Sequence, residues 1–191
     1  VDSGKSGAWA VESYGGTNAL TSEQGSIRVD AQGYEDATGV VADGRAARNE
    51  LGAAGGSVSI NADAERGYAF ALRAEAGGIN SVEAADVALE AVTDSWLYAD
   101  AAAGMYAGGK ESANKVDAAG SVRVSARSGG DDAYAMQAEN GGVNSITGSA
   151  SEINLNADGY YGAAGMYANG EGSANSIDAE GAAVFMAASG G

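Results

Sequence analysis

The sequence predicts an all-β chain folded as a right-handed parallel β-helix, or β-solenoid, of about six turns with three short strands per turn. The first observation behind this prediction is a repeat, in which an asparagine is followed two residues later by an aliphatic residue. The steps between successive asparagines are 31, 31, 34, 30 and 31 residues, so one turn takes about 31 residues. The asparagines are Asn18, Asn49, Asn80, Asn114, Asn144 and Asn175.

The second observation is that three short segments with alternating apolar residues recur in each period. The asparagine–aliphatic pair is the second segment, and in the third two aliphatic residues and an alanine occupy alternate positions. Side chains two positions apart lie on one face of a strand, so each segment is predicted to be a half-buried strand. The third segments are residues 27–31, 58–62, 87–91, 122–126, 153–157 and 184–188. The first segments carry Val11, Val40, Leu72, Met105, Met136 and Met166.

The third observation concerns the corners between strands. The chain has 31 glycines and no proline, and pairs such as Gly77-Gly78 and Gly141-Gly142 fall between the apolar segments. Glycine adopts positive φ at little cost, whereas proline would remove a donor from the strand ladder. Equivalent strands about 4.8 Å apart would then form three parallel sheets around a narrow core.

The repeated asparagines are expected to form a structural ladder. Each shares its predicted face with an aliphatic residue two positions later, as Asn80 does with Val82, so its amide points inward. A buried amide needs hydrogen-bond partners, which stacked amides and backbone groups of the turns can supply. Contact with a ligand is the alternative, although a ligand site rarely needs six identical copies.

Composition restricts the function of this chain. Its 191 residues fit a single domain spanning 1–191, and because the repeat runs to both ends we expect an internal fragment of a longer protein. A net charge of −16 argues against nucleic acid as a partner. No segment reaches the roughly 18 apolar residues of a membrane span, so the chain is not expected to cross a membrane. Without histidine or cysteine, serine–histidine catalysis, thiol catalysis and disulfides are excluded.

Three stretches resemble the repeats of bacterial autotransporter passenger regions. They are FALRAEAGGINSV at 70–82, YAMQAENGGVNSIT at 134–147 and GMYANGEGSANSI at 165–177, and the resemblance extends over about residues 7–188. It implies a right-handed β-helix at the cell surface or in the secreted fraction, with a role in adhesion or as a stalk. The expected function is therefore a non-enzymatic structural or adhesive segment. Its expected partner is a host or bacterial surface protein or a glycan, and self-association through the sides or ends of the rod is a further hypothesis.

Two chemical alternatives follow from the acidic residues. Paired carboxylates from neighbouring turns could hydrolyse glycosidic bonds, and stacked acidic oxygens could hold calcium. No cofactor is predicted, however, because the glycine-rich calcium nonapeptide and the EF-hand loop are both missing. The candidate carboxylates are Glu35, Asp36, Asp94, Asp100, Asp131 and Asp132.

One insertion is the candidate interaction patch. It lengthens one period to 34 residues and contains Trp96, Leu97 and Tyr98. Exposed together, these side chains would form an apolar patch of the kind enriched in binding sites, unless the insertion folds back over the adjacent turn. Tyr106 and Tyr167 occupy outward positions of the first segment, where they could form a second aromatic stripe that stacks against a sugar or a protein.

Overall fold

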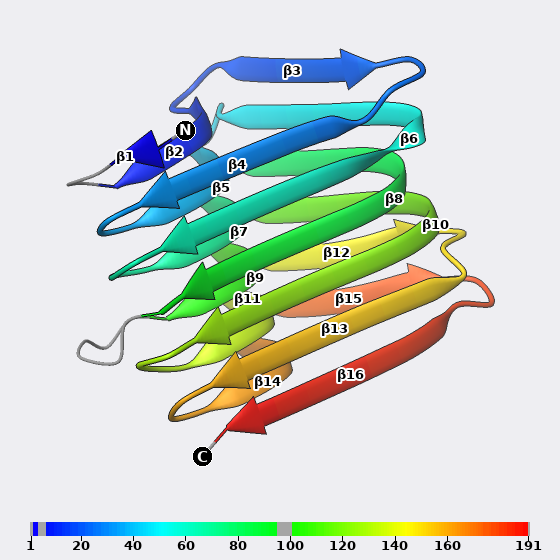
Figure 1. The fold of residues 1–191 in the computed structure, drawn as a ribbon. Helices are drawn as coiled ribbons and strands as arrows, with labels where there is room; N and C mark the ends of the chain where they lie inside the picture. The colour runs from blue at the N-terminus through cyan, green and yellow to red at the C-terminus, as the bar shows by residue number, and fades with distance from the viewer. Residues whose placement is uncertain (1, 4–6, 95–100, 191) are drawn as a thin grey trace.

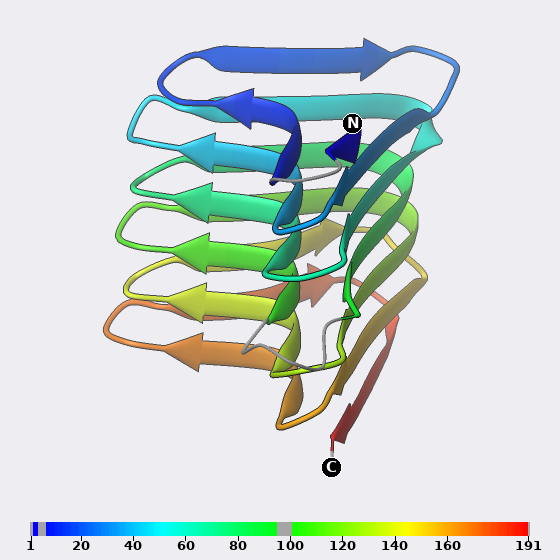
Figure 2. The same cartoon turned by 60° about the vertical axis from the view of Figure 1, so that its left-hand side comes forward.

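The chain forms a right-handed coil whose turns are made of β-strands and stack on one another, with its two ends at opposite ends of the stack (Figures 1 and 2). The computed structural model describes residues 2–3, 7–94 and 101–190, and these contain strands and no helix. Every strand pair is parallel, and residues about one period apart are paired. The predicted β-solenoid of about six turns is therefore confirmed.

The strands belong to two sheets, one of ten strands and one of six. The larger sheet contains β1 (Asp2–Ser3), β3 (Thr17–Ser22), β4 (Ile27–Gly33), β6 (Arg48–Ala64), β8 (Ile79–Thr93), β10 (Ala113–Ser128), β12 (Val143–Gly148), β13 (Glu152–Gly159), β15 (Ala174–Ala179) and β16 (Ala183–Gly190). The smaller sheet contains β2 (Ala8–Ser13), β5 (Ala37–Asp43), β7 (Ala69–Glu75), β9 (Ala102–Gly108), β11 (Ala133–Glu139) and β14 (Ala163–Asn169).

The sheet count differs from the three sheets expected from the sequence. In the central turns the second and third segments run on as the single long strands β6, β8 and β10, whereas in the outer turns they are separate strands. The ladder register shifts at the bend, between Ala53 and Ser57 in β6 and between Ala118 and Ser121 in β10. A strand can bend at such an irregularity without ending. The three segments of each turn therefore share two hydrogen-bonded sheets.

The core consists of ladders of equivalent apolar residues. Met105 on β9 pairs with Leu72 on β7 and Met136 on β11, and all three side chains are fully buried. Each such side chain contributes about 1.5–3 kcal/mol by leaving water. A separate alanine cluster fills the narrow corner where the third segment of a turn leads into the next first segment. Small side chains let the two sheets approach closely there.

Paired glycines form the turn that precedes each of two ladder asparagines. Gly77 has a φ of +90°, a conformation that strains any residue with a side chain. A Cβ on Gly78 would collide with the carbonyl group of Ala42 in the preceding turn. The same arrangement recurs at Gly141–Gly142. The first glycine therefore supplies the turn conformation and the second allows neighbouring turns to stack.

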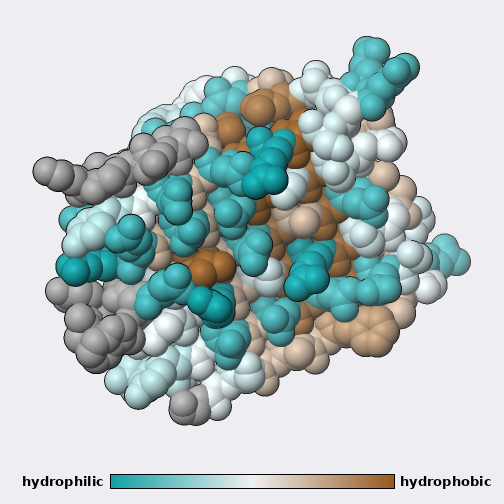
Figure 3. Space-filling view, in the orientation of Figure 1, coloured by the Kyte–Doolittle hydropathy of each residue, from teal (hydrophilic) through white to brown (hydrophobic). Residues whose placement is uncertain are grey.

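The outer face of the larger sheet is mostly hydrophilic. In Figure 3, hydrophilic side chains are spread over this face with apolar areas visible between them. On β4, Arg28 and Asp30 form an ion pair of 2.7 Å, and both side chains are largely exposed. Exposed pairs of this kind add little stability. Their role is to keep this side of the rod solvated.

Candidate binding groove on the smaller sheet

The asparagines form a continuous chain of hydrogen bonds along the interior. The Nδ2 of each of the first five asparagines donates to the Oδ1 of the asparagine in the next turn, at 2.8–3.0 Å. Asn49, Asn80, Asn114 and Asn144 are fully buried, whereas Asn18 and Asn175 in the outer turns are half-buried. A buried polar group is stable only when it is hydrogen-bonded, and this ladder meets that condition.

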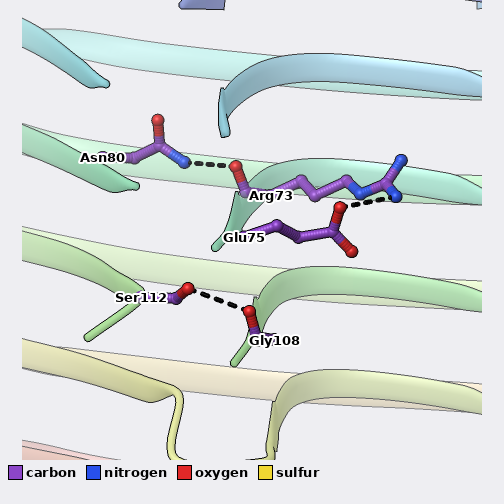
Figure 4. Close-up of polar contacts among 5 residues, drawn as sticks. All are labelled: Arg73, Glu75, Asn80, Gly108 and Ser112. Carbon is purple, nitrogen blue, oxygen red and sulfur yellow. Dashed lines mark hydrogen bonds and ion pairs between the residues drawn. The ribbon is translucent and has the colours of Figure 1, made fainter. Parts of the chain in front are cut away.

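Each asparagine also fixes the strand of the smaller sheet in its own turn. Its Nδ2 donates to one backbone carbonyl of that strand, at 2.6–2.7 Å. Figure 4 shows Asn80 bonded to the carbonyl of Arg73, while the Arg73 side chain extends away from the ladder and pairs with Glu75. In the next turn, the Ser112 hydroxyl donates to the carbonyl of Gly108 (Figure 4). The six carbonyls bonded to the ladder belong to Glu12, Val41, Arg73, Tyr106, Gln137 and Tyr167.

These strands carry a groove of about 270 Å³ on their outer face, which we call the β7–β11 groove. Arg73, Tyr106 and Gln137 occupy one register position on the adjacent strands β7, β9 and β11. Glu75 and Glu139 occupy another position near the ends of β7 and β11. The full lining is Tyr68, Phe70, Arg73, Glu75, Ala101, Tyr106, Gln137 and Glu139.

Aromatic rings form the apolar part of the groove. The ring centroids of Phe70 and Tyr106 are 5.1 Å apart, and Tyr68 stacks on Phe70 at 6.0 Å with an interplanar angle of 9°. Phe70 is only 8% exposed, whereas Tyr68 is 48% exposed. Tilted and offset pairs of this kind are the favoured arrangements of aromatic rings. Phe70 therefore supports the other two rings, and Tyr68 presents its ring to solvent.

Charged and amide groups border these rings. Arg73 Nη2 donates to Glu75 Oε2 at 2.9 Å, and the Arg73 guanidinium carbon lies 5.1 Å from the centre of the Phe70 ring. Arg73 Nε is buried and has no hydrogen-bond partner among the residues that the structure describes. Gln137 Nε2 donates to Glu139 Oε1 at 3.0 Å. Burial, with a smaller contribution from Glu139 and Glu75, raises the pKa of Tyr106, which keeps its hydroxyl neutral.

A second tyrosine pair continues the aromatic surface toward the C-terminal turn. The rings of Tyr134 and Tyr167 are 4.9 Å apart, and the Tyr134 hydroxyl donates to Asp132 Oδ2 at 2.7 Å. Burial, followed by this hydrogen bond, raises the pKa of Tyr134 far above its usual value. Sequence reasoning identified the outward positions of Tyr106 and Tyr167 and missed Phe70 and Tyr134. The available signal was their shared register: both align with Ala103 of β9.

The insertion patch predicted from the sequence, Trp96, Leu97 and Tyr98, lies outside the described residues, as does Asp100. Two of the other candidate carboxylates bond to different groups. Asp36 accepts a hydrogen bond from the backbone of Tyr68, and Asp94 forms an ion pair with Arg127.

An open hollow of about 620 Å³ is lined by Asp94, Arg127, Asp158 and Tyr160, among others. Its Asp94 carboxylate forms an ion pair with the Arg127 guanidinium. Among the residues that the structure describes, no three acidic side chains converge as a metal site. Within the same residues, no helix is long and apolar enough to cross a bilayer.

Comparison with known proteins adds no assignment to this geometry. No family model, no curated protein sequence and no solved structure matches the chain.

Proposed function

We propose that the chain is a non-enzymatic structural and adhesive segment of a bacterial autotransporter, located at the cell surface or secreted, in which a rigid rod presents binding surfaces. The observation that carries this proposal is the contrast between the asparagine ladder inside the coil and the outer surface of the smaller sheet, whose strands the ladder holds. Inside, one asparagine per turn fixes the backbone. Outside, the residues over that ladder differ from turn to turn, as Arg73, Tyr106 and Gln137 do.

Rigidity supports the structural part of the proposal. Parallel ladders connect each turn to the next, and the amide chain runs through the same turns. In a stack of repeats, each unit is stabilised by its neighbours. A rod built in this way keeps a surface group at a fixed distance from its point of attachment, which suits a stalk or an adhesin.

The assignment to autotransporters draws on the repeat resemblance at 70–82, 134–147 and 165–177. The non-enzymatic assignment draws on the candidate carboxylates. Asp94 is paired with Arg127, and Asp132 accepts the hydrogen bond of Tyr134. Both carboxylates are thus bonded to neighbouring side chains in the folded chain.

Surface display tests this proposal. The chain is placed between an export signal and an outer-membrane translocator barrel, and externally added protease reports whether it reaches the surface. Displaying cells are then incubated on surfaces coated with glycans or with extracellular proteins. We expect export and attachment above that of cells carrying the barrel alone. Failure of a chain that folds in vitro to reach the surface, or exported chain without attachment to any coating, would contradict the proposal.

A further inference from the structure

We propose that the β7–β11 groove binds a neutral glycan, with a pyranose ring lying against Tyr68 and Tyr106 and its hydroxyl groups bonded to Arg73, Gln137 and Glu139. This inference rests on the proposed adhesive function and specifies the class of its ligand. Five features of the groove support it, namely its rings, its mixed polar groups, its charge, its direction and its rigidity.

The rings fit the apolar face of a sugar. Tyr68 is exposed at the entrance of the groove, and Tyr106 is half-buried beside Phe70. The face of an aromatic ring carries partial negative charge, and it attracts the partially positive C–H groups on one side of a pyranose. A flat aromatic surface with polar groups at its edge is therefore suited to a ligand that has both kinds of surface.

The polar groups fit hydroxyls because they include donors and acceptors close together. Glu139 only accepts, the Gln137 amide does both, and Arg73 only donates. Of the three Arg73 guanidinium nitrogens, Nη2 alone has a hydrogen-bond partner among the described residues. A buried N–H group without a hydrogen-bond partner is unfavourable. A small rotation of the guanidinium toward a ligand oxygen would remove that cost.

The charge of the groove favours a neutral ligand over an acidic one. It contains two carboxylates, Glu75 and Glu139, and one guanidinium, Arg73. The whole chain has a net charge of −16. An acidic polysaccharide would be repelled by both the local and the overall field.

The direction of the groove favours a linear ligand longer than one ring. Arg73, Tyr106 and Gln137 are stacked on successive turns, and Tyr167 follows at the same register position. Neighbouring strands lie about 4.8 Å apart, so the side chains form a line along the rod axis. An oligosaccharide lying along that line would contact more groups than a monosaccharide and bind more tightly.

The ladder makes the groove rigid before a ligand arrives. The carbonyls of Arg73, Tyr106 and Gln137 each accept a hydrogen bond of 2.6–2.7 Å from an asparagine in the interior. Less conformational freedom is lost on binding when the binding residues are already fixed. The internal amides thus act as positioning residues for the outer surface.

The test is titration of the purified chain, by calorimetry and by NMR, with a panel of neutral linear oligosaccharides. An oligouronate and a lysine-rich peptide of similar length serve as competing ligand classes. We expect binding of at least one neutral oligosaccharide, with higher affinity than its monosaccharide. Tyr106→Ala should weaken it at least about tenfold, the loss typical of a central aromatic contact.

Matched controls keep the result interpretable. Tyr161→Ala removes a tyrosine that is 74% exposed and lies outside the groove, and it should leave affinity unchanged. Gln137→Ala removes only a half-buried amide, so it tests the groove if Tyr106→Ala fails to fold. Binding of only the oligouronate or the peptide, no binding by folded wild-type chain, or equal affinity of the groove variants and wild type would each overturn the proposal. Displaying cells that attach to protein coatings alone would leave the adhesive function standing and reject the glycan.

Discussion

The asparagine ladder inside the coil, on strands of the larger sheet, and the outer surface of the smaller sheet that it supports follow opposite rules. Inside, every turn places an asparagine at the same position, and four of the six are fully buried and bonded to their neighbours. Outside, the residues over those asparagines include an arginine, a glutamine and two tyrosines. The interior repeats because its groups must pair with each other, whereas solvent accepts many side chains. Variation on the outside can therefore specify a ligand without disturbing the coil.

The largest effect is expected for Asn114→Leu. This change leaves the Nδ2 of Asn80, the Oδ1 of Asn144 and the carbonyl of Tyr106 without their present partners. At about 1–3 kcal/mol for each unpaired buried group, the free energy of unfolding should fall by at least about 3 kcal/mol. Urea unfolding followed by circular dichroism measures this loss.

Asn18→Leu is the matched control, because Asn18 is half-buried in an outer turn where water can replace its partners. It should cost less than half as much. Equal losses in the two variants would refute the view that burial of the ladder is what stabilises the coil.

A cavity in the apolar ladder should have the next largest effect. Met105 is fully buried, so Met105→Ala is expected to lower the free energy of unfolding by about 2–5 kcal/mol. Met186, which is 58% exposed on β16, offers a comparison, and Met186→Ala should change stability by less than about 0.5 kcal/mol. Thermal and urea unfolding of both variants check this contrast. Similar losses of unfolding free energy for Met105→Ala and Met186→Ala would contradict the expected difference in packing between their two turns.

A smaller effect is expected from the glycines that separate the turns. Gly78→Ala places a Cβ against the carbonyl group of Ala42 and should cost about 1–3 kcal/mol. Gly16 precedes the first ladder asparagine, but a Cβ there has no neighbour within 4 Å. Gly16→Ala should therefore be neutral or slightly stabilising. Melting temperatures measured side by side distinguish the two positions, and a neutral Gly78→Ala would contradict the close approach of the turns.

The smallest predicted effect is a loss of stability at alkaline pH. Tyr134 has a raised pKa in the folded chain, so the unfolded state loses its proton first, at a pH of about 10. Since the folded state then binds more protons, stability is fully present below pH about 10 and declines as the pH rises through the folded pKa. Tyr134→Phe should flatten this decline, and unfolding curves between neutral and alkaline pH measure it. If the stability of Tyr134→Phe declines with pH as steeply as that of the wild type, the decline is caused by other titrating groups.

The sequence predicted most of what the interior requires. Asn80, Asn114 and Asn144 repeat because their amides bond to each other, and repetition is visible in a sequence. The merging of two segments into β8 and β10 was not visible, because it depends on how the backbone bends between them.

The binding groove was only partly predictable for the same reason. The equivalents of Phe70 in the neighbouring turns are Thr38 and Ala103, so an aromatic residue does not recur in successive turns and the shared register of Phe70 and Tyr134 is easily missed. Arg73 and Glu75 are two residues apart, which places them on one face of a strand, but their pairing needs side-chain geometry. The insertion patch at Trp96, Leu97 and Tyr98 stays a prediction.

Hydrogen exchange of the asparagine side-chain amides tests the central claim most directly, because NMR resolves these protons individually. The buried ladder predicts slow exchange for Asn49, Asn80, Asn114 and Asn144, and close contacts between amides about one turn apart in sequence. The exposed Asn156 should exchange quickly in the same sample. Exchange of the four ladder amides as fast as that of Asn156 would contradict the account.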